Sequence, residues 1–229
     1  MQSAQAAQRA LGRARMSAPG HYVVYGVPGW GSAIAEALLA LCGVVPLIDD
    51  VTGFDRPGPA RERLLRVNPL AQIPTLILPD GTIMTESAAI ALLLAERFPG
   101  AALAPAPGDE SRAQFLRRLI WLVANVYPTF TYGDYPERWV ETEASRLKAS
   151  IDAYRERLWR ELEAALGSGT WMLGDQLSAL DVYVAVMTHW RPRRRWFAEH
   201  CPRLSAIAAR ADEHPILRGV LRRNFPAAE

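Results

Sequence analysis

Two polar positions of the chain stand where helices are expected to begin, and either could bind an anion. The Glu86-Ser87 pair precedes an apolar run over residues 88–95, which is typical of the start of a buried helix. Ser32 follows a loop rich in glycine and proline and is expected to cap another helix. The first N–H groups of a helix are unpaired and its dipole is positive there, so both positions suit a carboxylate or a thiolate.

A β-hairpin is predicted directly before Glu86. Two short β-branched runs are joined by Pro79-Asp80-Gly81, and Asp-Gly supplies the positive φ angles that a tight turn requires. Ile73-Pro74 lies where the chain enters the first strand of this hairpin. A proline there removes one hydrogen-bond donor and is compatible with a cis peptide bond, so the backbone of Ile73 is a candidate to bind a ligand.

The composition argues against several classes of protein. Among 229 residues there are 26 basic and 24 acidic side chains, a net charge of +2, so nothing favours nucleic acid or an anionic membrane as a partner. Cys42 and Cys201 form neither a CxxC motif nor a metal-ligand cluster; a disulfide between them is compatible with the sequence, but a cysteine-poor chain is typical of the cytosol. No run of about 18 apolar residues predicts a membrane span. We therefore expect a cytoplasmic protein with no metal, no nucleic acid and no membrane partner.

The order of the expected elements divides the chain into two domains. Strands are predicted at 21–25 and 44–48, helices at 32–42 and within 49–66, and then the hairpin and the helix from residue 88. This β-α-β-α-β-β-α order predicts a small α/β domain over 21–98. PGAALAPAPG at 99–108 is the expected linker, because its prolines and glycines exclude regular structure.

The remaining segments are an N-terminal extension and a helical domain. Residues 1–20, rich in Ala, Gln and Arg, are expected to be a flexible extension or an overlong start before Met16; a transit peptide is the alternative. Residues 109–226 show no convincing strand. Apolar residues keep helical spacing from 115 to Pro128, and a longer stripe runs over 140–166.

Ser178-Ala-Leu-Asp181 resembles a helix capping box, with Asp in place of the usual Glu or Gln. The apolar run that follows suits a buried helix, so we expect Asp181 to have a structural and not a catalytic role. The basic cluster after His189, at Arg191 and 193–195, is expected to be solvated or paired with acids, with phosphate binding as the alternative.

Taken together, NPLAQIP, the Asp-Gly hairpin and the Glu-Ser pair resemble the glutathione-binding half of the cytosolic glutathione transferases. GDQLSALD is similar to the capping box at the sixth helix of that family. The resemblance spans about residues 22–226. It implies an α/β thioredoxin-like domain over 21–98 and an all-helical bundle over 109–226.

The resemblance also assigns a glutathione site. It implies that Ser87, through its hydroxyl and N–H, receives the γ-glutamyl carboxylate, and that Glu86 accepts the γ-glutamyl ammonium. It implies that the Ile73 backbone pairs with the cysteinyl portion, held by a cis Pro74, and that Gln72 lies toward the glycyl end. The alternative for Glu86 and Ser87 is a simple helix cap.

The group that activates the glutathione thiol is the hardest to assign. A free thiol has a pKa near 8.5, so only a few per cent is thiolate at neutral pH unless the protein stabilises the anion. Relatives place a Tyr, Ser or Cys near the first strand. One bacterial subgroup has a cysteine where this chain has Gly31, which argues against a mixed-disulfide mechanism. Ser32 is the first candidate, Tyr25 a weaker one, and the alternative is that Ser32 only caps its helix.

The pocket for the second substrate is expected between the domains. Trp30 is a candidate wall of the thiol pocket, and residues 125–135 concentrate aromatic rings and hydroxyls, as suits an apolar pocket with a few polar groups. Tyr127 or Tyr132 could hydrogen-bond the sulfur or the substrate; the alternative is that both rings only pack the domain interface.

These expectations describe a glutathione transferase of the detoxification type. Its glutathione thiolate would attack a small hydrophobic electrophile by substitution or addition, with glutathione as co-substrate and no metal, and family members are usually homodimers. The alternatives are another glutathione-dependent enzyme on the same fold (an isomerase, a dehalogenase or a peroxidase) or a non-catalytic protein-interaction module.

Overall fold

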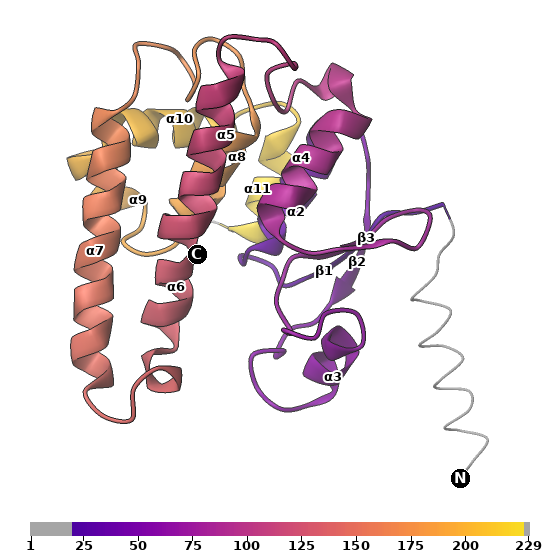
Figure 1. The fold of residues 1–229 in the computed structure, drawn as a ribbon, viewed down its shortest axis with the longest axis vertical. Coiled ribbons are helices and arrows are strands. Elements are labelled where there is room, and N and C mark those ends of the chain that lie inside the picture. The colour runs from indigo at the N-terminus through magenta and orange to yellow at the C-terminus, as the bar shows by residue number, and fades with distance from the viewer. Residues whose placement is uncertain (1–19, 227–229) are drawn as a thin grey trace.

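The computed structural model describes residues 20–226, and it begins with a small mixed β-sheet (Figure 1). The strands are β1 (Val23–Gly26), β2 (Leu47–Asp50), β3 (Thr75–Ile77) and β4 (Ile83–Met84), in the order β2-β1-β3-β4. β1 is parallel to β2 and antiparallel to β3, which is antiparallel to β4. The helices of this half are α2 (Ser32–Leu41), α3 (Pro59–Leu65) and α4 (Ser87–Arg97), which confirms the predicted order. The extension predicted for residues 1–20 lies outside the described residues except for Gly20.

The alternation of side chains along β1 assigns the two faces of the sheet. Val24 packs in the same hydrophobic cluster as α2 and α4, whereas Val23 and Tyr25 pack in a second cluster with Leu64 of α3. Tyr25 is only 2% exposed. It therefore belongs to the core on the α3 side of the sheet, and this burial agrees with its place as the weaker candidate for activating the thiol.

The second strand and the linker segment differ in detail from the prediction. The second strand begins at Leu47 and not at Val44, because the Val44 N–H bonds to the Leu39 carbonyl at 2.9 Å and so closes the end of α2. Pro46, which lacks an N–H donor, separates that closure from the strand. The predicted linker is also not free of regular structure, since it opens with the 3-10 turn η1 (Pro99–Ala101).

The second half of the described chain is helical, and no strand forms within residues 99–226. Its elements are α5 (Arg112–Trp121), η2 (Leu122–Val126), α6 (Tyr127–Asp134), η3 (Pro136–Arg138), α7 (Ala144–Ala164), α8 (Ala179–Met187), α9 (Arg194–His200), α10 (Pro202–Asp212) and α11 (Leu217–Asn224). In Figure 1, α5 and α6 stand between α7 and the sheet-bearing half, and α11 packs against α2. None of the helices in residues 20–226 is long and apolar enough to cross a membrane.

The helix predicted to end before Pro128 instead continues through it. The π-helical turn η2 joins α5 to α6, and Pro128 is the second residue of α6. Proline lacks the N–H that an inner helical residue needs, and a π turn is a common way to absorb such a defect. One inserted residue turns the following side chains by about 100° around the helix axis, so η2 sets the direction of Tyr127.

The predicted capping box at α8 is confirmed. Asp181 accepts hydrogen bonds from the Ser178 N–H at 2.8 Å, the Ser178 hydroxyl at 3.0 Å and the Met172 N–H at 2.8 Å. The carboxyl group is fully buried, and burial raises its pKa to about 6 although these hydrogen bonds lower it. The groups that donate to Asp181 are two backbone N–H groups and the hydroxyl of the cap residue, so Asp181 holds the start of α8 in place.

The two halves share one hydrophobic core. A single buried cluster contains Ile34 and Leu38 of α2 together with Val184 of α8 and Leu221 of α11. The linker joins this packing, because the Leu103 carbonyl accepts a 2.7 Å hydrogen bond from the Ala179 N–H at the start of α8. The two halves are therefore held in a fixed arrangement by this shared core.

Candidate functional site

A cavity of about 890 Å³ lies between the two halves. The sheet-bearing half contributes the loop before α2, the loop before β3 and the start of α4, and the helical half contributes α6 and the loop before α9. All the site residues predicted from the sequence line it except Ser32: Trp30, Gln72, Ile73, Pro74, Glu86, Ser87, Tyr127 and Tyr132. A cavity of this size could hold a peptide-sized ligand together with a second small molecule.

The NPLAQIP loop is held from within by its asparagine. Asn68 is 3% exposed, and its side-chain amide donates to the Gln72 carbonyl at 3.0 Å and to the Thr75 hydroxyl at 3.1 Å. Its side-chain oxygen accepts from the Leu70 N–H at 3.0 Å. These bonds satisfy the loop internally and leave the Gln72 side chain exposed at the cavity.

The backbone of Ile73 is available to a ligand. The Ile73-Pro74 peptide bond is cis, as predicted, and β3 begins only at Thr75. Among residues 20–226, neither the N–H nor the carbonyl of Ile73 has a hydrogen-bond partner. Unpaired backbone groups at the edge of a cavity are suited to pairing with the backbone of a bound peptide.

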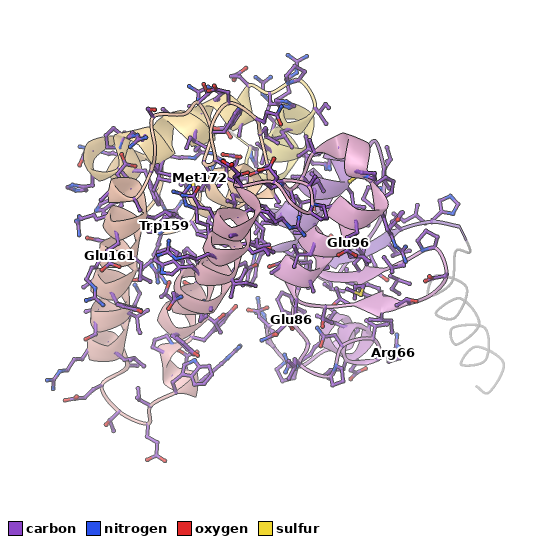
Figure 2. The ribbon with its side chains drawn as sticks, turned by 45° about the horizontal axis from the view of Figure 1, so that its top comes forward. Arg66, Glu86, Glu96, Trp159, Glu161 and Met172 are labelled. Carbon is purple, nitrogen blue, oxygen red and sulfur yellow. The ribbon has the colours of Figure 1, made fainter. Side chains whose placement is uncertain are left out.

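Glu86 and Ser87 do not form the simple helix cap that was the alternative reading. α4 begins at Ser87, and the residue before it, Glu86, has φ 62° and makes no side-chain hydrogen bond to the helix. A positive φ in a residue other than glycine is an unfavourable conformation that is found often at functional sites. Figure 2 shows Glu86 between the two halves of the molecule, and its carboxylate makes no ion pair within the described chain. Both side chains are therefore free to bind a ligand.

Tyr183 of α8 lies behind Ser87. Its hydroxyl is fully buried, has no well-formed hydrogen bond within the described chain, and is close enough to the Ser87 hydroxyl to be affected by it. Burial raises the pKa of Tyr183, so the group is protonated and can donate. Tyr183 thereby places a second hydroxyl at the first turn of α4, which no sequence motif indicated.

The structure does not bring Ser32 to the cavity. Its side chain is fully buried, and its hydroxyl donates to the Val27 carbonyl and accepts from the Val27 N–H, both at 3.1 Å. It also does not cap α2, since the cap residue is Gly31 and Ser32 is the first helical residue. Ser32 therefore closes the loop 27–32, and its hydroxyl is not available to a ligand in this geometry.

Tyr127 occupies the space beside Gly31 instead. A Cβ atom built on Gly31 would lie 2.0 Å from the Tyr127 hydroxyl oxygen and 3.1 Å from the Ile73 carbonyl oxygen. Burial, and secondarily the Glu86 carboxylate, raises the pKa of Tyr127 well above its usual range. The phenol is therefore neutral at physiological pH, and it has a proton to donate at the meeting point of both halves.

The helical half also clamps the loop before α2. The Trp190 indole N–H donates to the Gly29 carbonyl at 2.8 Å, and the Gly29 N–H donates to the Asn224 side-chain oxygen at 3.1 Å. Trp30, next in the loop, is 39% exposed and packs edge-on against Phe54 at the cavity wall. Nothing in the sequence indicated Trp190 or Asn224, because both reach this loop from about 160 or more residues away.

The basic cluster is paired with acids at three of its four predicted positions. Arg191 pairs with Asp134, and two more pairs join Arg194 to Asp212 and Arg195 to Glu199. Arg193 lines the cavity, has φ 79°, and makes no ion pair within residues 20–226. No group of three or more His, Cys, Asp or Glu side chains that could hold a metal occurs in that range.

Comparisons with known proteins agree with this geometry. A family model described as "Glutathione S-transferase, N-terminal domain" matches residues 32–97. The chain is 46% identical over 201 residues to the uncharacterized GST-like protein YncG of Escherichia coli strain K12, covering 88% of this chain and 97% of that protein. It is 27% identical over 158 residues to glutathione S-transferase GstA of E. coli O157:H7, covering 68% and 75%. A solved structure of a sphingomonad glutathione S-transferase complexed with glutathione has a TM-score of 0.73 at 26% identity, covering 90% and 100%.

This chain belongs to the cytosolic glutathione transferase superfamily, in its bacterial type. The thioredoxin-like sheet domain and the helical C-terminal region expected from the sequence are those of that family.

Proposed function

We propose that this protein is a glutathione transferase that conjugates the glutathione thiolate to small hydrophobic electrophiles. The observation that carries the proposal is the composition of one cavity wall, where the unpaired Ile73 backbone lies near the free side chains of Glu86 and Ser87. A peptide with one ammonium and two carboxylates needs this combination of a backbone edge, an acidic side chain and a helix N-terminus. A scaffold protein has no chemical need for it.

Each end of glutathione has a candidate partner in this wall. The Ser87 hydroxyl and N–H, at the positive end of the α4 dipole, would bind the γ-glutamyl carboxylate. Glu86 would bind the ammonium, and the Ile73 backbone would bind the cysteinyl portion. Gln72, exposed at the cavity, would lie toward the glycyl carboxylate.

A second group of lining residues suits the electrophile. Trp30, Tyr132 and Phe130 line the cavity with aromatic surface, and Tyr132 packs edge-on against Trp139 with ring centroids 4.7 Å apart. Aromatic surface of this kind favours substrates with apolar or aromatic groups. In keeping with the family resemblance, we also propose a cytoplasmic homodimer, which sedimentation of the purified protein would test.

Calorimetric titration with glutathione, on the wild type and on Ser87→Ala, tests the proposal. We expect the dissociation constant to rise about tenfold or more in the variant, because a hydrogen bond to a charged group is worth about 1.5–3 kcal/mol. Ser150→Ala, an exposed serine of α7, is the matched control and should bind as the wild type does. Conjugation to a chloronitrobenzene then tests catalysis. Absence of glutathione binding by the wild type would refute the enzyme assignment, and binding without conjugation would favour a non-catalytic module.

A further inference from the structure

We propose that the Tyr127 hydroxyl, contributed by the helical half, donates the hydrogen bond that stabilises the glutathione thiolate. This inference rests on the proposed function. It assigns the stabilisation of the thiolate to a residue of α6, because the loop before α2 offers no side chain for it. Gly31 has no side chain, and the Ser32 hydroxyl is bonded to Val27.

The position of the hydroxyl carries the first step. The Tyr127 oxygen and the Ile73 carbonyl both lie within 3.1 Å of the same point, the Cβ position of Gly31. If the Ile73 backbone holds the cysteinyl residue of glutathione, the sulfur is only a few bonds away from that backbone contact. The Tyr127 hydroxyl then lies next to the sulfur.

The hydrogen-bonding state of Tyr127 carries the second step. Burial and the neighbouring Glu86 carboxylate keep the phenol protonated, so it offers one donor hydrogen. The Tyr127 hydroxyl makes no hydrogen bond to another residue among residues 20–226, and its side chain is partly exposed where it lines the cavity, so the donor is available to a ligand there. A thiolate is an anionic acceptor and would satisfy the donor at the place where the ligand is expected.

The packing of the ring carries the third step. Tyr127 packs edge-on against Trp190 with ring centroids 5.6 Å apart and against Phe130 at 6.5 Å. Trp190 is itself bonded to the Gly29 carbonyl. The donor is therefore fixed relative to the loop before α2 and needs no rearrangement when charge develops on the sulfur.

The chemical step is balanced without an additional reactant. The thiol proton passes to water when glutathione binds as the thiolate, and Tyr127 keeps its own proton throughout. In a substitution, the sulfur forms a bond to carbon and the leaving group departs with its electron pair. Tyr127 lowers the free energy of the anion and does not act as the base.

The test is the thiol pKa of bound glutathione, measured by ultraviolet difference absorbance on saturated wild type, Tyr127→Phe and Tyr154→Phe. Tyr154 is a half-exposed tyrosine of α7 outside the cavity, and its variant is the matched control. We expect the thiol pKa to rise by about one unit or more in Tyr127→Phe, and kcat at neutral pH to fall about tenfold with a smaller change in KM. An unchanged thiol pKa in a folded Tyr127→Phe variant overturns the inference.

A second variant tests the same contact without removing the tyrosine. In Gly31→Ala the new methyl group takes the space of the Tyr127 hydroxyl, so the thiol pKa should rise as it does in Tyr127→Phe. Gly100→Ala, with open space at the corresponding position, is the control. If both Tyr127→Phe and Gly31→Ala bind glutathione with the wild-type thiol pKa, this inference is refuted and the transferase assignment stands. If the wild type does not bind glutathione, both are refuted.

Discussion

The Trp190 indole N–H donates a hydrogen bond to the Gly29 carbonyl across 2.8 Å, so a residue that follows α8 holds the loop that precedes α2. The Asn224 side chain holds the same residue through its other backbone group, by accepting from the Gly29 N–H. The loop that carries Trp30 and Gly31 is therefore shaped by the helical half. Its conformation is not an internal property of the sheet domain.

Trp190→Phe should loosen this loop without unfolding the protein. The variant loses one hydrogen bond and keeps most of the aromatic packing, so we expect about 1 kcal/mol less stability and about a fivefold weaker glutathione complex. Faster amide exchange at Gly29, measured by NMR, would locate the effect. Trp196→Phe, on α9 and outside the cavity, is the control and should not change that exchange rate.

Ser32→Ala should destabilise the fold and leave the thiol pKa of bound glutathione unchanged. The substitution leaves the buried Val27 N–H without its acceptor, at a cost of about 1–3 kcal/mol, whereas the Val27 carbonyl keeps its bond from the Trp30 N–H. Urea denaturation measures the cost, and ultraviolet titration of the glutathione complex measures the thiol pKa. A clear rise of that pKa, with stability preserved, would return Ser32 to the role that the sequence first suggested.

Asp181 should make stability depend on pH between about 4 and 6. Its pKa is raised in the folded state to about 6, above the value of about 3.9 in an unfolded chain, so its contribution is greatest below pH 4 and is lost as the pH rises to about 6. The loss should be on the order of 3 kcal/mol. It is measured as the difference in unfolding free energy between the wild type and Asp181→Asn at a series of pH values.

The control for this titration is Asp109→Asn. Hydrogen bonds from Ser111 lower the pKa of Asp109, so the difference for this variant should move in the opposite direction and increase as the pH rises through the acid range. A flat Asp181 difference between pH 4 and 6 would show that the buried carboxyl is ionised throughout.

Features with a local cause could be predicted from the sequence. The hairpin follows from Asp80-Gly81 and the start of α8 from Ser178 and Asp181, whereas the cis Ile73-Pro74 bond was expected from the family resemblance. In each case the residues that cause the feature are within a few positions of one another. The five residues that the family resemblance proposes for glutathione lie on two short segments of this kind, and all five line the cavity.

Features set by distant packing could not be predicted. Ser32 stands at a helix start as a capping serine does, but its hydroxyl turns back to Val27 because the preceding loop places that backbone against it. Pro128 usually marks the end of a helix, and only a π turn, which has no sequence signal of its own, let the helix continue. Tyr183 and Trp190 reach the site through the docking of α8, which is decided by the whole core.

The shared core has a consequence for how the molecule comes apart. α2 packs against both α8 and α11 within one hydrophobic cluster, so separation of the sheet half from the helices would expose a broad apolar surface to water. Neither half could then open while the other stays intact, and the chain should lose its structure in one cooperative transition despite its two architectural classes. A ligand bound between the halves would protect the entire chain against proteolysis, because it binds only the folded state in which the two halves are packed together.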